Sequence, residues 1–380
     1  MRIGIVVPHI FMHRDILPQV IFSPAELALD LAAGLQAQGT DVTLFTPGPI
    51  DTPVRNITAD LTYFERELAG RGDTYTDLLK KHPVTFITLA RQVQAELIAN
   101  AFAMANRGEL DVVHIYTNEE DIALPIAALC RKPVVFTHHD PFNFLVKYKN
   151  VFPKYSHLNW IAISNAQRKG MPSDTHWLAT IYHGIQESLF HLNTAPRGGY
   201  VAYLGRIIAP KGVHLAIEAL KTYNATHDTR LKLKIAGKHY AGNKDTYWQE
   251  QIKPQIDDDS IEYVGFIKTA DEKQQFLGNA EALIIPSTFE EPFGMVMIEA
   301  LACGTPIIGL DSGAIPEVIK HGRNGLLVRK DDPAYTLADA LGDIATIDRA
   351  ACRADFEARF TAERMCRDHQ AVYRQLHGAQ

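Results

Sequence analysis

Two carboxylates near the C-terminal end, Glu291 and Glu299, have the chemistry and the spacing to hold one ligand between them. Glu291 follows an apolar stretch that predicts a strand, and Glu299 lies in a helix expected to begin near Gly294. If the eight steps between them were helical, they would span roughly 12 Å, about the reach from a sugar ring across a diphosphate to a ribose. Backbone N–H groups at a helix start favour anions. These groups belong to Phe293, Gly294, Met295 and Val296, so the segment suggests a clamp for a nucleotide sugar.

Two cations in an earlier segment could meet the same ligand. Arg206 and Lys211 lie in the run GRIIAPKG (residues 205–212), directly after an apolar strand. The guanidinium of Arg206 suits bidentate contact with phosphate oxygens, and Lys211 adds a mobile positive charge. Gly205 permits a sharp turn, and Gly212 opens the next helix. Taken alone, the segment could equally be a solvated basic loop, but the carboxylates downstream favour phosphate binding.

The elements that would position these residues alternate between strands and helices. In the first half, strands are expected at 3–7, 41–45, 111–115, 133–136 and 160–163. A helix should run from Ser23, as N-cap before Pro24, to a stop at Gly39. A long helical region is expected from about Tyr75 to Asn106. Short apolar strands separated by helices predict a parallel sheet covered on both faces.

The same alternation starts again after the turn-rich segment 196–199. Strands are expected at 200–204, 231–236, 261–264, 282–285, 306–310 and 325–328, followed by a last amphipathic helix from about Ala358 to Leu376. The predicted fold class is α/β, with two doubly wound Rossmann-like domains facing an interdomain cleft. The expected domains are residues 1–195 and 196–357, with a helix of about 358–380 packed back on the first. Ligands should bind in that cleft.

Length and composition narrow the functional classes. At 380 residues the chain exceeds what one hydrophobic core usually supports, so two domains are expected. The formal net charge of -6 argues against general nucleic-acid binding. The four cysteines share no metal-ligand spacing, and no apolar run reaches the roughly 18 residues needed to span a membrane. A soluble cytoplasmic enzyme is the expectation.

Several motifs together resemble the family-four retaining glycosyltransferases of the GT-B fold, also called glycosyl transferases group 1. They are the spaced glutamates, the GRIIAPKG loop, GAIPEVIKHGRNG (residues 313–325) and FTAERM (residues 360–365). The resemblance is strong over roughly 197–376 and looser before it, where DVVH (111–114) and ISNA (163–166) still match. In that family the last helix crosses back to the first domain.

The resemblance implies a role for each residue of the suspected clamp. It assigns Arg206 and Lys211 to the donor diphosphate, Glu291 to hydroxyls of the donor sugar and Glu299 to the ribose. It gives the backbone amides from Phe293 to Val296 to the sugar and the phosphates. The second domain would therefore bind a nucleotide sugar, and the first would face the acceptor.

Two departures from the family pattern concern the first domain. Many relatives carry a glycine pair before the first long helix, where this chain has Phe22 and Ser23. Many also place a histidine two residues after the DVVH motif, against the donor sugar, where this chain has Tyr116. Tyr116 could bond the sugar instead, or His138 or His139 could take over that role. The two histidines could equally be a polar strand end packed against a neighbouring loop.

No metal and no cofactor are expected at the site. The triplet Asp257-Asp258-Asp259 resembles the metal-binding acidic triplet of a different glycosyltransferase fold, but its place before a strand favours a solvated turn. Arg206, Lys211 and the helix dipoles would neutralise the leaving diphosphate instead.

The segment 141–154, PFNFLVKYKNVFPK, interleaves aromatic residues with lysines. It could rest on an anionic membrane that holds a lipid-linked acceptor, or form a lid over the acceptor. A packed surface helix is favoured, because amphipathic helices are common in globular folds.

These observations favour a retaining glycosyltransferase that moves a hexose from a nucleotide diphosphate sugar, UDP-glucose first, to an acceptor hydroxyl. Its catalytic residues would be Arg206, Lys211, Glu291, Tyr116 and His139. A sugar-nucleotide epimerase of the same two-domain plan and a non-catalytic nucleotide-sugar-binding regulator are the alternatives. A phosphorylase would need a cofactor lysine and a much longer chain. The acceptor, which could be a sugar, a lipid-linked sugar or a small molecule, is not encoded in any motif.

Overall fold

The computed structural model describes residues 1–20, 22–117, 119–239 and 245–378. It divides the chain into two compact units. Unit 1 is Met1–Tyr182 together with the segment that begins at Ala362, and unit 2 is His183–Thr361. The predicted α/β class with two doubly wound parallel sheets is confirmed.

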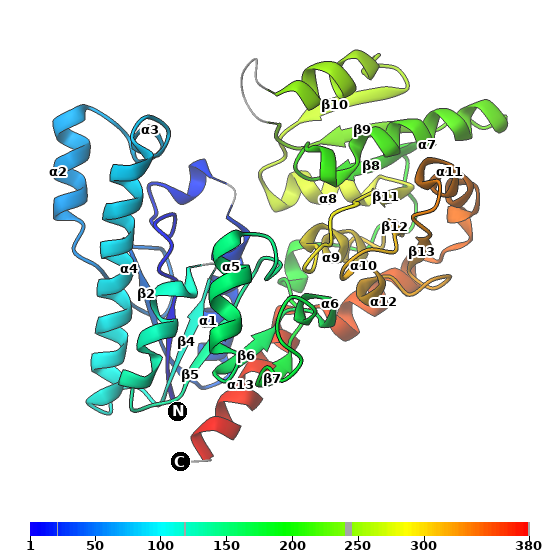
Figure 1. The fold of residues 1–380 in the computed structure, drawn as a ribbon. Coiled ribbons are helices and arrows are strands. Elements are labelled where there is room, and N and C mark those ends of the chain that lie inside the picture. Colours follow the sequence, from blue (N-terminus) through cyan, green and yellow to red (C-terminus); the bar gives the residue numbers. More distant parts are fainter. Residues whose placement is uncertain (21, 118, 240–244, 379–380) are drawn as a thin grey trace. The chain divides into compact units, whose positions relative to one another are not determined.

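Unit 1 holds a seven-stranded parallel sheet in the order β3-β2-β1-β4-β5-β6-β7 (Figure 1). Its strands are β1 (Arg2–Val6), β2 (Asp41–Thr46), β3 (Arg55–Thr58), β4 (Val112–Tyr116), β5 (Val134–Thr137), β6 (Asn159–Ala162) and β7 (Trp177–Thr180). The two edge strands, β3 and β7, were not expected. Both are only partly buried and lack the continuous apolar run of the inner strands, so local pattern does not reveal them.

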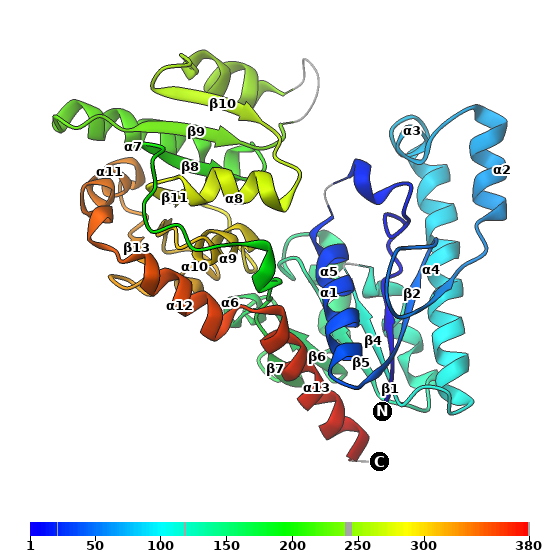
Figure 2. The same cartoon turned by 180° about the vertical axis from the view of Figure 1, so that it is seen from behind.

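Helices cover both faces of this sheet. They are α1 (Ser23–Ala37), α2 (Thr62–Arg71), α3 (Tyr75–Lys81), α4 (Pro83–Asn106), α5 (Val146–Val151), α6 (Asn165–Arg168) and α13 (Ala362–Gly378). The two opposite views place α4 and α5 on one face and α1 and α13 on the other (Figures 1 and 2). The predicted return of the last helix to the first unit is therefore observed.

Unit 2 holds a six-stranded parallel sheet in the order β10-β9-β8-β11-β12-β13. Its strands are β8 (Tyr200–Leu204), β9 (Lys232–Ala236), β10 (Ile261–Gly265), β11 (Ala282–Ile285), β12 (Ile307–Leu310) and β13 (Gly325–Val328). Its helices are α7 (Val213–Thr226), α8 (Ala270–Gly278), α9 (Met295–Ala302), α10 (Ile315–Val318), α11 (Pro333–Asp343) and α12 (Arg349–Arg359), with a π-helical turn at Tyr247–Ile252. The strand order reverses between β8 and β11, where open α/β sheets bind ligands.

Three helix boundaries differ from expectation. Phe22, not Ser23, is the N-cap of α1, and no side chain bonds to the helix start there. The helical region expected from Tyr75 to Asn106 is two helices, because the proline at position 83 begins a new one. The last helix, α13, begins at Ala362 and not near Ala358, because residues 358–359 end α12 and the chain then passes from unit 2 to unit 1.

The segment 183–195 belongs to unit 2, although the expected boundary follows it. The backbone N–H of Asn193 donates to the carbonyl of Cys303 over 3.0 Å. The buried guanidinium of Arg349 donates to the Asn193 carbonyl at 2.5 Å and to the carbonyl of Gly278 at 2.8 Å. Such long-range bonds tie this turn-rich segment to helices that follow it by more than a hundred residues.

Within the described residues, no helix is long and apolar enough to cross a membrane.

Helix α13 is held on the first sheet by a buried polar contact. The hydroxyl of Tyr373 lies 2.6 Å from His114 Nδ1, and His114 Nε2 lies 2.8 Å from the Thr137 hydroxyl. His369 Nδ1 donates to the Met365 carbonyl, and its buried Nε2 has no partner among the described residues. Burial lowers the pKa of His369 to about 4 and the pKa of His114 well below its ordinary value.

We expect acid to weaken this packing. Because the pKa of His369 is about 4 in the folded chain and 6.5 ordinarily, the unfolded chain binds a proton in this window that the folded chain excludes. Stability is therefore present above pH 6.5 and is lost as the pH falls towards 4, by roughly 3 kcal/mol from this group. Urea unfolding from pH 7 to 4 should show a shallower loss in His369→Gln, and an unchanged loss in the exposed control His377→Gln on the same helix. Parallel curves for His369→Gln and the wild type would contradict the assignment.

Candidate functional site

The loops that follow β8 and β11 bring Lys211 and Glu291 together at the carboxyl edge of the second sheet. The Lys211 ammonium forms a very short ion pair with Glu291 Oε1. The hydroxyl of Ser287 donates to the same oxygen over 2.9 Å. The Glu291 side chain is mostly buried, whereas that of Lys211 is about a fifth exposed. The predicted cation and carboxylate thus form one ion pair, although 80 positions separate them in the sequence.

Two glycines allow the backbones around this pair to approach. Gly212 has a φ of 73°, and a Cβ there would lie 2.0 Å from the Pro286 carbonyl oxygen. Gly313 has a φ of 54°, and a Cβ there would lie 2.4 Å from the Glu291 nitrogen. The next residue, Ala314, donates its N–H to the Glu291 carbonyl over 2.8 Å. Side chains at these two positions would separate the loops that carry the pair.

Glu299 has a lysine partner of its own. Its Oε1 accepts a hydrogen bond of 2.7 Å from the ammonium of Lys273, on α8. Glu299 is buried within α9, so this bond offsets part of the cost of removing its carboxylate from water. Each glutamate of the spaced pair is therefore matched by one lysine.

The start of α9 has the geometry expected for binding an anion. Gly294 is the N-cap with a φ of 93°, and Met295 is the first helical residue. The first N–H groups of an α-helix have no intrahelical acceptor. The preceding Phe293 is buried, with its ring 5.0 Å from the His183 ring, which fixes the turn before the helix. The amides of Phe293 to Val296 thus lie at the start of the helix that carries Glu299.

Arg206 extends from the same edge. Its carbonyl accepts a 2.8 Å hydrogen bond from the Tyr203 hydroxyl, which fixes the backbone as β8 ends. The side chain is exposed and forms no ion pair with the described part of the chain. Arg206 is therefore a cation open to solvent, in contrast to Lys211.

In unit 1, Tyr116 and His139 are in contact with each other. Their rings lie 4.5 Å apart and nearly perpendicular. Tyr116 is fully buried, and its hydroxyl has no hydrogen-bond partner among the described residues. Burial raises the pKa of Tyr116. Its ring also faces His369 of α13 at 6.2 Å, so Tyr116 lies between the sheet and that helix.

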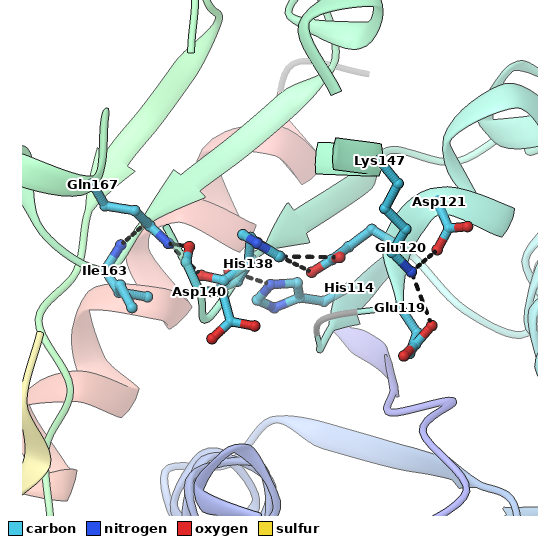
Figure 3. A network of polar contacts seen from close by, with 10 residues as sticks. His114, Glu119, Glu120, Asp121, His138, Asp140, Lys147, Ile163 and Gln167 are labelled. Atoms are coloured by element: carbon cyan, nitrogen blue, oxygen red, sulfur yellow. Dashed lines mark hydrogen bonds and ion pairs between the residues drawn. The ribbon is translucent and has the colours of Figure 1, made fainter. Parts of the chain in front are cut away.

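The carboxyl edge of the first sheet carries a polar network (Figure 3). His138 Nδ1 lies 3.2 Å from both oxygens of Glu120, and both side chains are wholly buried. The Lys147 ammonium reaches Glu119 at 3.4 Å and Asp121 at 3.1 Å. Of the two histidines suggested by the sequence, His138 is thus enclosed within the network.

The position where many relatives carry two glycines is occupied by an aromatic contact. The ring of Phe22 lies 4.4 Å from that of His9, and Phe11 packs on the same imidazole at 4.5 Å. His9 Nε2 is 4.0 Å from Glu119 Oε1. Burial lowers the pKa of His9 to about 4, so this edge presents a neutral imidazole.

Comparison with known proteins decides the family. Residues 198–346 match the family described as Glycosyl transferases group 1, and residues 25–185 match Glycosyltransferase Family 4. The first match lies within unit 2, the second lies in unit 1 except for residues 183–185, and together they cover most of the chain. The chain belongs to the group 1 glycosyltransferases. The resemblance first suggested by the motifs is confirmed, as is the GT-B fold.

Individual relatives of this glycosyltransferase are distant. It is 25% identical over 346 residues to a phosphatidyl-myo-inositol mannosyltransferase from Propionibacterium freudenreichii, covering 84% of this chain and 79% of the relative. It is similar in structure to a sucrose-phosphate synthase from Thermosynechococcus elongatus, with a TM-score of 0.71, 21% identity and full coverage of both chains. HepE from Anabaena, in complex with UDP-glucose, gives a TM-score of 0.67 at 18% identity, again covering 100% of both chains.

Other sequence features of the glycosyltransferase have structural explanations. Asp257 Oδ1 accepts N–H groups from Asp259, Ser260 and Ile261 at 2.8–3.0 Å, so the acidic triplet forms a turn. In the segment 141–154, Tyr148 and Phe152 are buried, which agrees with a packed helix. Phe144 and Leu145, just before α5, and Val146, its first residue, remain exposed.

Sequence reasoning did not identify Ser287, Lys273 or Glu120. Ser287 follows the end of β11, so its place after a strand was a signal that could have been used. Lys273 lies among charged residues of a surface helix and has no local signal. Glu120 stands between two other acidic residues, a pattern typical of a solvated turn.

Proposed function

We propose that this glycosyltransferase transfers a hexose from a nucleoside diphosphate sugar, with UDP-glucose as the first candidate, to an acceptor hydroxyl with retention of configuration. The observation that carries the proposal is the pairing of Lys211 with Glu291 beside the start of α9. It combines an anion site with a carboxylate suited to sugar hydroxyls. The UDP-glucose complex of the Anabaena neighbour supports the choice of donor, while the mannosyltransferase relative makes GDP-mannose the second candidate.

Binding of the diphosphate would use Arg206, Lys211 and the amides from Phe293 to Val296. Glu291 would orient the sugar and Glu299 the ribose. In unit 1, which would face the acceptor, Tyr116 and His139 are the candidates for the contact to the donor sugar, and His139 is the less enclosed of the two.

Catalysis would rest on charge stabilisation and orientation. The leaving diphosphate would develop its charge against fixed cations and helix N–H groups, and its own oxygen would take the acceptor proton. No metal ion or cofactor is part of the proposal. The protein groups would stabilise the charge of the diphosphate or orient the substrates, and none would act as a strong base.

Donor binding tests the function directly. A thermal-shift panel of UDP-glucose, GDP-mannose and UDP-N-acetylglucosamine should show stabilisation by one donor, because a ligand present at 100 times its Kd adds about 2.7 kcal/mol to the native state. Incubation of that donor, labelled in the sugar, with candidate acceptors should release nucleoside diphosphate and give a product of unchanged anomeric configuration. An epimerised donor, or binding with no nucleoside diphosphate release, would overturn transferase activity. Stabilisation by no donor would overturn the donor class.

Glu291→Gln should tighten UDP binding while it lowers turnover. In the ligand-free protein Glu291 competes with a diphosphate for Lys211, and removing its charge frees the ammonium. We expect UDP affinity to rise about threefold to tenfold by calorimetry, since a partly exposed ion pair contributes about 1 kcal/mol. Turnover should fall about a hundredfold with the lost sugar contact.

The neighbouring exposed Glu290→Gln is the matched control and should change neither quantity. Lys211→Ala should weaken UDP binding and lower turnover by orders of magnitude. Weaker UDP binding in Glu291→Gln would show that the pair does not compete with the ligand.

Lys273→Met should weaken the preference of the site for a nucleotide that carries the ribose 2′-hydroxyl. The ammonium of Lys273 orients Glu299, and methionine keeps the length of the side chain without the hydrogen bond. We expect UDP affinity to fall about fivefold and the preference for UDP over 2′-deoxy-UDP to shrink. Lys268→Met, an exposed change just before the same helix, is the control. Unchanged affinities for both nucleotides would remove Lys273 from the site.

A further inference from the structure

A buried contact joins the two loops that carry the polar edge of the first sheet. Glu120 follows β4, His138 follows β5, and neither side chain is exposed. His138 Nδ1 lies 3.2 Å from each carboxylate oxygen. Figure 3 shows the two side chains facing each other across the gap between the loops. The pair is therefore a link between neighbouring strands at their carboxyl ends.

The surroundings of this pair are aromatic. The His138 ring lies 4.9 Å from Phe142, 4.4 Å from Tyr148 and 5.1 Å from Phe152. Burial raises the pKa of Glu120 well above its ordinary value and lowers the pKa of His138 to about 3, because desolvation disfavours both charges. Burial therefore favours the neutral form of both partners, and the link is a hydrogen bond between His138 Nδ1 and the Glu120 carboxyl group.

Gln167 fixes the second loop from the other side. Its amide Nε2 donates to the carbonyl of His138 at 2.8 Å and to that of Asp140 at 3.0 Å. Its Oε1 accepts the N–H of Ile163 over 3.0 Å. The two carbonyls belong to the residues before and after His139, so the backbone on both sides of that histidine is held.

Each member of the buried pair is the sequence neighbour of a residue at the edge. Glu119 precedes Glu120, keeps a side chain about a quarter exposed and lies 4.0 Å from His9. His139 follows His138 and packs on Tyr116. A shift in the buried link would move both edge residues, because one peptide unit separates each from its anchor.

We propose that the Glu120–His138 link and the Gln167 amide position Glu119 and His139 for an acceptor hydroxyl. The four carbonyl and side-chain contacts fix the loops relative to each other before any ligand binds. Glu120, His138 and Gln167 are positioning residues, and Glu119 and His139 are the groups that meet the acceptor. This inference rests on the proposed transferase function.

The test compares Glu120→Ala with Glu120→Gln, whose amide can donate a hydrogen bond to His138 Nδ1 or accept one from it. Asp121→Asn is the matched control, because Asp121 is the next carboxylate and contacts Arg91 and Lys147 instead. UDP affinity is measured by calorimetry. Release of nucleoside diphosphate from the donor chosen by the panel is measured with water, glycerol and myo-inositol as acceptor probes.

We expect Glu120→Ala to lower turnover at saturating donor at least tenfold with UDP affinity within twofold of the wild type. Glu120→Gln and Asp121→Asn should stay within threefold in turnover. Wild-type turnover in Glu120→Ala would overturn the proposal, as would a parallel loss of UDP affinity, which would indicate a general loss of fold. If Glu120→Ala does not fold, Gln167→Met decides, because it removes only the clamp on the second loop and should show the same signature.

A second readout is independent of the proposed function. In protein labelled with ¹³C at histidine Cε1, the His139 signal, identified by its loss in His139→Gln, should shift in Glu120→Ala and not in Asp121→Asn. A wild type that binds no nucleotide and releases none would refute the transferase function, while a shifted His139 signal would still support the positioning link. An unmoved His139 signal would overturn the link itself.

Discussion

The parallel direction of all strands in each sheet is the constraint on which the site depends. Parallel pairing requires crossovers, so every strand of a unit ends at the same edge. The strand order reverses between β8 and β11, and open α/β sheets bind their ligands between the loops that follow the strands at such a reversal. Lys211 and Glu291 meet there although their segments are far apart in the sequence. Gly212 and Gly313 permit the close backbone contact that this meeting needs.

Charge matching within unit 2 follows from burial. A carboxylate removed from water needs a partner, and both glutamates of the spaced pair have a lysine. In the ligand-free protein, neither of these glutamates is therefore left without an opposite charge beside it. An anionic ligand that takes Lys211 must at the same time satisfy Glu291, and sugar hydroxyls can do so. The same molecule would then supply both the phosphate and the hydroxyls, which favours a nucleotide sugar over free phosphate.

The sequence predicted most of the fold and the centre of the site, because both depend on local pattern. Inner strands such as β8 and β11 match their expected bounds, since a buried parallel strand is a continuous apolar run. The sequence did not predict the edge strand β3 or the helix break at Phe360–Thr361. A partly buried edge strand and a change from one unit to the other leave no periodic signal in the sequence. The segment 183–195 escaped for another reason. Its place is set by the Arg349 guanidinium, which bonds to carbonyls that any sequence would present.

Burial affects the ionisable groups of the two units differently. In unit 2 the Arg206 side chain is exposed, and Lys211 has a carboxylate beside it. At the edge of unit 1, burial lowers the pKa of His9 and His138 and raises the pKa of Glu120, which favours the neutral form of each group. A diphosphate that gains charge as it leaves needs fixed cations, whereas an acceptor hydroxyl needs hydrogen-bonding groups held in place without strong charge. Under the proposed function, each unit thus carries the kind of group that its own ligand requires. The Glu120–His138 link removes two ionisable groups from water, and in return it fixes the geometry of the loops at the acceptor side.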